Sequence, residues 1–301
     1  MIDPVFLGSP QYACEPLGDA MGLTLLLKVE TQNPIRSFKG RGAELFVARD
    51  AGDAPLVCAS AGNFGQAMAY ACRSRARPLT VFASQHANPL KVGRMRALGA
   101  DVRLAGADFD QAKEAARHHA AERAFRYVED GHEVAIAEGA GTLALELLQA
   151  RAELDALFVP VGNGALLAGV GSVMRARRPA VQLIAVGAAG APAMIGSLRR
   201  GRSITTSSVA TIADGVAVRV PVPAALDDLD GLVDDTVLVD DDAIVAAMRA
   251  LHEHAGLVVE PAGAVGLAGL LRHADDWKGA RVATIVCGGN VTAAQRRSWL
   301  A

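Results

Sequence analysis

Lys39 is the residue whose type and surroundings first suggest covalent chemistry. It lies between an apolar stretch that predicts a strand, residues 23–27, and a stretch that predicts a helix, residues 43–49. A lysine that reacts with a carbonyl group needs an amine that is held at a cleft and is partly deprotonated, which burial and neighbouring positive charge promote. Arg36 and Arg41 flank Lys39 and would supply that charge. This segment alone is compatible with a Schiff-base lysine and with an ordinary solvated surface lysine.

Two glycine-containing turns follow predicted strands and could bind anions. Residues 60–66, Ser-Ala-Gly-Asn-Phe-Gly-Gln, open a helix, so their backbone amides and the helix N-terminus suit a substrate carboxylate, with Asn63 near enough to bond a ring hydroxyl. An ordinary tight turn is the alternative. Residues 161–169, Val-Gly-Asn-Gly-Ala-Leu-Leu-Ala-Gly, would form a phosphate cradle from bare amides. This second turn has neither the Lys-Ser/Thr of a P-loop nor the acidic residue of a dinucleotide site, so it predicts a phosphate without a nucleotide.

Two further residues of reactive type stand beside predicted element ends. Cys287 places a thiol at the end of a strand-like run, next to two glycines and Asn290. Glu260 directly precedes a predicted helix start, where a carboxylate is also favourable simply as part of a cap.

These residues require a fold that brings several strand ends together. Short β-branched runs predict strands at residues 56–60, 79–84, 101–106, 156–162, 182–187 and 282–289, and helical periodicity occupies residues 65–75, 89–98, 108–123, 142–151 and 241–254. This alternation predicts an α/β fold of two domains, with mainly parallel twisted sheets flanked by helices and a ligand at the strand ends in the interdomain cleft. We expect residues 55–132 to form a small mobile domain, and residues 1–54 and 133–301 to form a large cofactor-binding domain.

The composition excludes several classes of partner. The chain has 301 residues, 51% of them hydrophobic, and a formal net charge of -2 without a run of like charges, so neither nucleic acid nor an anionic membrane is an expected partner. It has no signal-like N-terminus or apolar span, which predicts a cytoplasmic protein. The four scattered cysteines, Cys14, Cys58, Cys72 and Cys287, predict free thiols.

Seven segments in order resemble the signatures of one enzyme family. They are SFKGRGA, SAGNFGQ, AGTLALEL, VGNGALLAG, TIADGVAV, EPAGAVG and CGGN, and together they resemble the fold-type II pyridoxal 5'-phosphate (PLP) enzymes of the threonine/serine dehydratase family. The resemblance extends from about Lys28 to Asn290 and implies a tryptophan synthase β-like fold and a homodimer. It implies the removal of water from a β-hydroxy amino acid such as L-threonine or L-serine, giving a 2-oxo acid and ammonia.

The resemblance also assigns roles to individual residues. Lys39 would carry PLP as a Schiff base, and its freed amine would remove the α-proton of the substrate. The other residues that it places at the cofactor are Phe38 against the ring, Asn63 at the ring hydroxyl, Cys287 at the pyridine nitrogen, Gly162, Asn163, Gly164 and Ala165 at the phosphate, and Glu260 nearby. The substrate loop would be Ser60, Ala61, Gly62, Asn63 and Phe64, with Ser60 and the amides that follow it at the carboxylate. A thiol does not hold the pyridine nitrogen firmly protonated, so loss of a β-leaving group is the expected outcome.

The sequence departs from the family at several positions. Ala61 replaces the serine that acts as second acid/base in the serine racemases of this group, so weak or absent racemisation is expected. Phe64 replaces a histidine, which favours a more apolar substrate. Residues 187–193 carry no oxygen-bearing side chain, so we expect no metal there. Because the sequence ends soon after CGGN, we expect neither the regulatory domain of biosynthetic threonine deaminases nor feedback by isoleucine.

Other functions remain as alternatives. Within the family these are a β-replacement enzyme of the cysteine-synthase type and a dehydratase for a bulkier hydroxy amino acid. Outside it they are a catalytically silent protein that retains the fold and a nucleotide-binding α/β protein, although the retained Lys39 and Asn63 argue against a decayed site. His118 and His119 are expected to be solvated, and the acidic stretch 227–242 is expected to be an exposed loop with helix-start charge.

Overall fold

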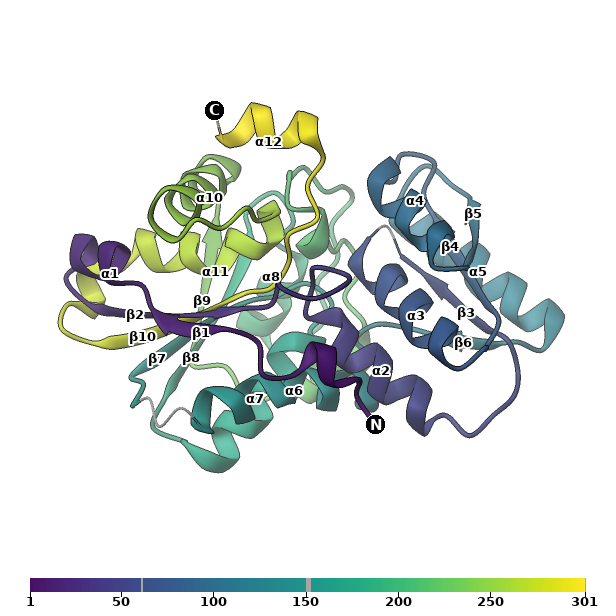
Figure 1. Cartoon of the computed structure of the whole chain (residues 1–301), viewed down its shortest axis with the longest axis horizontal. Helices are drawn as coiled ribbons and strands as arrows, with labels where there is room; N and C mark the ends of the chain where they lie inside the picture. Colours follow the sequence, from purple (N-terminus) through teal and green to yellow (C-terminus); the bar gives the residue numbers. More distant parts are fainter. Residues whose placement is uncertain (61, 150–152, 301) are drawn as a thin grey trace.

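The computed structural model describes residues 1–60, 62–149 and 153–300, and its strands form two sheets (Figure 1). The large sheet has the order β1 (Gln11–Ala13), β2 (Thr24–Val29), β10 (Arg281–Val286), β7 (Ala156–Pro160), β8 (Gln182–Ala188) and β9 (Asp235–Val239). The small sheet has the order β5 (Asp101–Leu104), β4 (Leu79–Ala83), β3 (Leu56–Ala59) and β6 (Arg126–Val128). Neighbouring strands pair in parallel, apart from the antiparallel pair β1 and β2. The prediction of an α/β fold with mainly parallel sheets is confirmed.

Helices flank both sheets. They are α1 (Glu15–Met21), α2 (Lys39–Arg49), α3 (Asn63–Ser74), α4 (Pro89–Ala97), α5 (Phe109–Arg123), α6 (Val134–Gln149), α7 (Ala165–Arg177), α8 (Ala193–Arg200), α9 (Pro223–Leu229), α10 (Asp241–Ala255), α11 (Pro261–Arg272) and α12 (Ala293–Leu300), with short 3-10 turns η1 (Pro4–Phe6), η2 (Asp214–Val216) and η3 (Ala274–Trp277). Figure 1 shows α10 and α11 on one side of the large sheet and α6 and α7 on the other. Helix α2 packs against both α6 and α3, so it connects the two halves of the molecule. Within the described residues, no helix is both long enough and apolar enough to cross a membrane.

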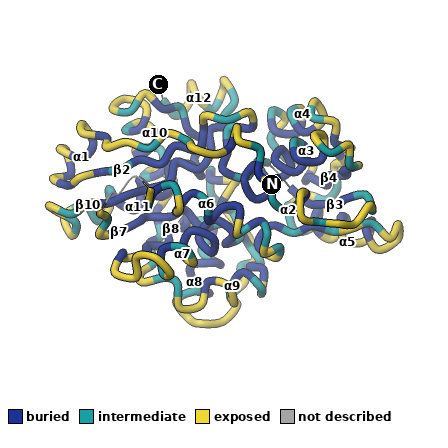
Figure 2. The backbone as a smooth tube through the Cα atoms, turned by 60° about the horizontal axis from the view of Figure 1, so that its bottom comes forward, coloured by how far each residue is buried: buried dark blue, intermediate teal, exposed yellow. Residues whose placement is uncertain are grey.

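The central strands are buried on both faces. Every residue of β3, β4 and β7 is buried, as is usual for parallel strands covered by helices on each side. In β3, Leu56 and Cys58 pack toward α3 and α4, whereas Val57 and Ala59 pack toward α5. Figure 2 shows the same concentration of buried backbone along the strands, with exposed segments at the periphery. Such sheets are rigid, and they leave their strand ends available for a site.

Helices α2 and α6 both begin earlier than the sequence predicts. Helix α2 begins at Lys39 instead of residue 43, and α6 begins at Val134 instead of residue 142. Both early turns contain glycine, which lowers helix propensity and hides the signal. The glycines are used for close packing, because a Cβ at Gly139 would lie 2.5 Å from the carbonyl oxygen of Arg41.

Two further expectations are wrong in part. The acidic stretch 227–242 contains strand β9, whose Val237 and Val239 are buried against the large sheet. His118 is exposed as expected, but His119 is only 8% exposed and packs against the rings of Phe82 and Phe125. Adjacent residues of a helix face different directions, and here only one of the two faces solvent.

A cluster of four charged side chains links the β2 segment to α2 and α6, and its members are Lys28, Glu30, Arg41 and Glu146. The Arg41 guanidinium is fully buried and lies 2.9 Å from Glu30 Oε1 and 2.6 Å from Glu146 Oε1. Lys28, also fully buried, lies 2.6 Å from Glu146 Oε2. Two positive and two negative charges therefore balance one another, as buried charges must if they are to remain ionised.

The charge on Glu146 predicts an acid-sensitive stability. Burial raises the pKa of Glu146, but the hydrogen bonds from Arg41 and Lys28 outweigh burial and lower it to about 2 from an ordinary 4.5. Because the folded-state pKa is depressed, this stabilisation is complete above about pH 5 and is lost as the pH falls toward the folded pKa. We expect the free energy of unfolding in urea to decrease over that range, and to decrease less steeply in Glu146→Gln. Equal pH slopes in the two proteins would contradict this account.

Candidate active site

A cavity of about 350 Å³ lies between the two sheets, at the carboxyl ends of β3, β7 and β10. Ser60 follows β3, Gly162 follows β7 and Cys287 follows β10. The predicted site residues that line the cavity are Phe38, Lys39, Ser60, Gly62, Asn63, Phe64, Gly162, Asn163, Gly164, Ala165, Glu260 and Cys287. Ala61, also predicted to be at the site, lies outside the described residues. The fold thus brings separate segments together at strand ends, where α/β proteins bind ligands.

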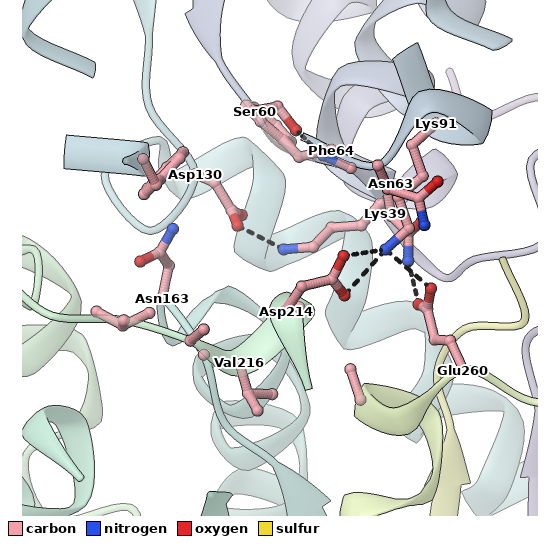
Figure 3. Close-up of a pocket in the computed structure, with 18 of the residues that line it drawn as sticks. Lys39, Ser60, Asn63, Phe64, Lys91, Asp130, Asn163, Asp214, Val216 and Glu260 are labelled. Atoms are coloured by element: carbon pink, nitrogen blue, oxygen red, sulfur yellow. Dashed lines mark hydrogen bonds and ion pairs between the residues drawn. The ribbon is translucent and has the colours of Figure 1, made fainter. Parts of the chain in front are cut away.

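Lys39 extends its side chain into this cavity (Figure 3). Its Nζ lies 4.8 Å from the centre of the Phe38 ring and 5.9 Å from that of Phe64. The amine is 2.5 Å from Asp130 Oδ2, and the Lys39 side chain is only 15% exposed. The alternative of a solvated surface lysine is therefore wrong.

The charge beside Lys39 differs in sign from the prediction. Arg41 turns away from the cavity to Glu30 and Glu146, because residues two apart on a helix face nearly opposite directions. The charged group that contacts the Lys39 amine is instead the carboxylate of Asp130. Asp130 lies outside the seven recognised segments, so the sequence carried no signal for it.

The turn between β7 and α7 forms a cradle of backbone amides. Gly164 is the N-cap of α7 and has a φ of 96°, in the left-handed region that favours glycine. A Cβ at Gly162 would lie 2.8 Å from the carbonyl oxygen of Gly215, so a larger residue would disturb the wall of the cavity. The amides at the start of a 13-residue helix attract a negatively charged group. This arrangement fits the phosphate group of PLP.

Ser60 organises the turn that leads into α3. Its Oγ accepts hydrogen bonds from the amides of Gly62, at 3.1 Å, and Gly65, at 2.8 Å. A Cβ at Gly65 would lie 2.3 Å from Met95 Sδ, so the turn is held close to α4. The Ser60 hydroxyl therefore has a clear structural role, and its predicted role at a substrate carboxylate stays a prediction.

A second charged cluster joins the two halves of the molecule across the cavity. Lys91 Nζ, from α4, lies 2.7 Å from Asp214 Oδ2 and 3.2 Å from Glu260 Oε2. Burial lowers the pKa of Lys91, but the charges of Glu260 and Asp214 outweigh burial and raise it. Burial raises the pKa of Glu260, and Lys91 opposes that rise. Lys91 is therefore a fixed cation at physiological pH.

Asn63 is held by hydrogen bonds at both ends of its side chain. Its Nδ2 donates to Glu260 Oε1, and its Oδ1 accepts from Asn290 Nδ2 at 2.9 Å. Asp214 and Asn290, which the site prediction omitted, lie within the segments TIADGVAV and CGGN, so the resemblance carried a signal for them. Lys91 lies in none of the seven segments.

Cys287 contributes a neutral thiol to the cavity. Burial raises the pKa of this thiol to about 12, and the nearby charge of Glu260 adds to the effect. Its Sγ lies 3.4 Å from the carbonyl oxygen of Ala262, to which it donates. The thiol therefore stays protonated at neutral pH.

The chemistry of the lining fits PLP. The half-buried amine of Lys39 suits an aldehyde, the 162–165 turn suits a phosphate group, and Phe38 offers an aromatic face beside that amine. In the part of the chain that the structure describes, no group of three or more His, Cys, Asp or Glu side chains is arranged to hold a metal ion. The expected absence of a metal at residues 187–193 stays a prediction.

Comparisons with known proteins agree with this fit. The family model described as "Pyridoxal-phosphate dependent enzyme" matches residues 2–288. The chain is 36% identical over 277 residues to the L-threonine ammonia-lyase of Geobacter sulfurreducens. The aligned region covers 91% of this chain and 69% of that protein. It is also 36% identical over 289 residues to the biosynthetic L-threonine dehydratase of Escherichia coli, covering 94% of this chain and 56% of that protein.

A solved structure gives the same result for the fold. The processed form of threonine deaminase isoform 2 from Solanum lycopersicum superposes with a TM-score of 0.92 at 30% identity, over 98% of this chain and 84% of that one. The match extends over both sheets and over the segments that line the cavity. This chain therefore belongs to the family of pyridoxal-phosphate dependent enzymes, in the fold-type II group of the threonine and serine dehydratases.

Proposed function

We propose that this protein uses PLP held at Lys39 to remove water from a β-hydroxy amino acid such as L-threonine or L-serine, giving a 2-oxo acid and ammonia. The observation that carries this proposal is the largely enclosed Lys39 amine, which lines one cavity with the amide cradle and the 60–65 turn. The similarity to proteins named L-threonine ammonia-lyase and L-threonine dehydratase supports it. PLP, when bound, draws electrons away from the α-carbon of an amino acid and so makes its α-proton removable.

Each group of residues in the cavity would have a separate role. Lys39 would hold the cofactor through its ε-amine, and its free amine would accept the α-proton of the substrate. The amides of residues 162–165 bind the phosphate, and the 60–65 turn orients the substrate through its carboxylate. Phe38 would flank the cofactor ring, and Asn63 would bond its hydroxyl group.

The neutral thiol of Cys287 favours elimination over other outcomes. We infer that it would face the pyridine nitrogen of bound PLP, where a carboxylate would hold a positive charge but a protonated thiol would not. Negative charge at the substrate α-carbon is then stabilised less, and departure of the β-hydroxyl group becomes the favoured exit.

The proposal is tested by supplying PLP-loaded protein with L-threonine and L-serine and measuring 2-oxo acid release, with and without added sulfide. Release that sulfide does not suppress supports the dehydratase. Capture of sulfide into a new amino acid in preference to water would support the β-replacement alternative. Weak or absent racemisation of L-serine stays an expectation, because Ala61 lies outside the described residues.

An apolar wall favours a second candidate, a dehydratase for a bulkier hydroxy amino acid. Phe64 is 6% exposed and lines the cavity together with Phe109 and Val209. Burial of a larger apolar side chain against this wall would add to binding. A higher kcat/KM for β-phenylserine than for L-threonine would support this candidate, and a lower one would exclude it.

The charge of the cavity predicts discrimination against substrates with a second carboxylate. Its described lining holds four acidic side chains, Asp108, Asp130, Asp214 and Glu260, against two lysines, Lys39 and Lys91, and no arginine. An added carboxylate would meet like charges, which costs several kcal/mol at close range. We expect kcat/KM for 3-hydroxyaspartate to be about 10- to 100-fold below that for L-threonine. Equal values for the two substrates would show that this charge does not select.

We also propose how the chain divides into two domains. We infer that residues 55–132 move as a small domain against residues 1–54 and 133–301, since the contacts between them include ion pairs, such as Lys91 with Asp214 and Asp110 with Arg219, that can be exchanged for water.

A homodimer in the cytoplasm is our proposal for the working state. The exposed apolar side chains of Val5, Leu7 and Leu145 lie on two segments that a hydrogen bond between Gly8 and Glu146 joins, which suits a subunit contact. Light scattering of the purified protein tests the dimer.

The four buried free thiols suit a reducing compartment such as the cytoplasm.

A further inference from the structure

Asp130 is fixed beside the Lys39 amine by the packing of its own backbone. It lies in the turn between β6 and α6, and the next residue, Gly131, has a φ of 89°. A Cβ at Gly131 would lie 2.3 Å from the carbonyl oxygen of Asn163, so this turn is pressed against the amide cradle. The carboxylate of Asp130 is therefore held between the small sheet and the cradle, facing the cavity (Figure 3).

The carboxylate of Asp130 is buried and only half satisfied. Its side chain is 10% exposed, its Oδ2 contacts Lys39 Nζ at 2.5 Å, and its Oδ1 has no hydrogen-bond partner among the described residues. A buried acceptor without a partner costs on the order of 1–3 kcal/mol. An unsatisfied buried group calls for an explanation, and the position of Asp130 beside the Lys39 amine points to a functional one.

The other acidic groups near the amine are engaged elsewhere. Asp214 and Glu260 both pair with Lys91. Glu129, which directly precedes Asp130, pairs with Lys113 on α5, away from the cavity. Among the described residues, Asp130 is thus the carboxylate that forms an ion pair with the Lys39 amine.

We propose that Asp130 is a further catalytic residue, whose carboxylate holds the Lys39 amine in place and stabilises the positive charge that the amine gains on accepting the substrate α-proton. This inference rests on the proposed function, in which Lys39 is the proton acceptor. In this step the Cα–H bond breaks, an N–H bond forms at Nζ, and the electron pair stays with the substrate. Lys39 changes from neutral to +1 beside the fixed negative charge of Asp130, so the pair becomes neutral.

The surroundings of the amine make this partner important. The rings of Phe38 and Phe64 lie within cation–π distance of the Lys39 amine and attract its ammonium form weakly, but neither ring supplies the negative charge of a carboxylate. A charge formed in such partly apolar surroundings needs a fixed counter-charge, and a preorganised group at 2.5 Å supplies it without rearrangement.

Exchange of the α-hydrogen of L-alanine in deuterium oxide isolates the proton-transfer step, because alanine has no β-leaving group. In PLP-loaded Asp130→Asn we expect the exchange rate, measured by NMR, to fall about 10- to 100-fold. Attachment of PLP to Lys39, measured by absorbance and by mass spectrometry after borohydride reduction, should persist, because the amine needs no carboxylate to react with an aldehyde.

Two variants control this experiment. Glu129→Gln makes the same chemical change one residue earlier, outside the cavity, and should exchange at the wild-type rate. Asp130→Glu retains the charge and should recover much of the lost rate, which a purely structural role would not produce. If Asp130→Asn does not fold, Asp130→Glu and Asp130→Gln make the same comparison, since they differ only in charge.

Three outcomes would overturn the proposal. They are exchange in Asp130→Asn within threefold of wild type, failure of the folded variant to attach PLP, and equal rates for the Asp130→Glu and Asp130→Gln pair. A wild-type protein that exchanges the α-hydrogen but releases no 2-oxo acid would refute the proposed elimination. The exchange rates would still decide the role of Asp130 in that case.

Discussion

Lys39→Ala is expected to lower 2-oxo acid release from L-threonine on the order of 10³-fold or more. The variant loses both the amine that would hold PLP and the group that would accept the α-proton. Lys91 cannot substitute for it, because Asp214 and Glu260 hold that ammonium group in its charged form. The measurement is the initial rate of 2-oxo acid formation by protein loaded with excess PLP.

A matched control separates this effect from the loss of any lysine. Lys278→Ala removes a surface lysine that pairs with Asp275, and it should leave the rate unchanged. Mass spectrometry of wild-type protein after borohydride reduction should find PLP on the peptide that contains Lys39. A Lys39→Ala variant with a rate within tenfold of wild type, or a reduced adduct on Lys91, would contradict the assignment.

Arg41→Leu is expected to lower the free energy of unfolding by about 3–5 kcal/mol. The guanidinium is fully buried between Glu30 and Glu146, and its removal leaves two carboxylates with only Lys28 to balance them. Leucine replaces part of the volume but none of the hydrogen bonds. Unfolding in urea, with the slope compared between variant and wild type, measures the loss.

Arg49→Leu provides the comparison within the same helix. Arg49 pairs with Glu138, but the two side chains are 58% and 48% exposed, so solvent screens the pair. Exposed ion pairs contribute about 0–1 kcal/mol, and we expect a loss in that range. Similar losses in the two variants would show that the buried cluster contributes no more than a surface pair.

The lysine and the amide cradle could be predicted because their signals are local. In each case a strand, a short turn and a helix follow one another within a few residues, so the local sequence predicts both the turn and its function. The early start of α2 was hidden by the glycines around Arg41. In a helix that begins at Lys39, Arg41 points away from Lys39, because residues two apart face nearly opposite directions.

Asp130 and Lys91 could not be predicted in the same way. Each is an ordinary charged residue in its own segment, and its importance comes from contact with a distant one, Lys39 for Asp130 and Glu260 for Lys91. Strand β9 could not be predicted for a related reason. It is a five-residue strand at the edge of the large sheet, and its apolar residues 237–239 are enclosed by the acidic Asp234, Asp235 and Asp240.

The central claim is that this chain is a PLP-dependent dehydratase, and its most direct test is the stoichiometry of products from L-threonine. Protein freed of PLP, and the same protein after reloading, are given L-threonine, and 2-oxobutanoate and ammonia are measured together. The account predicts equal amounts of the two products from the reloaded protein and neither from the protein without PLP. Reloaded protein that shows PLP attached at Lys39 but releases neither product would contradict it.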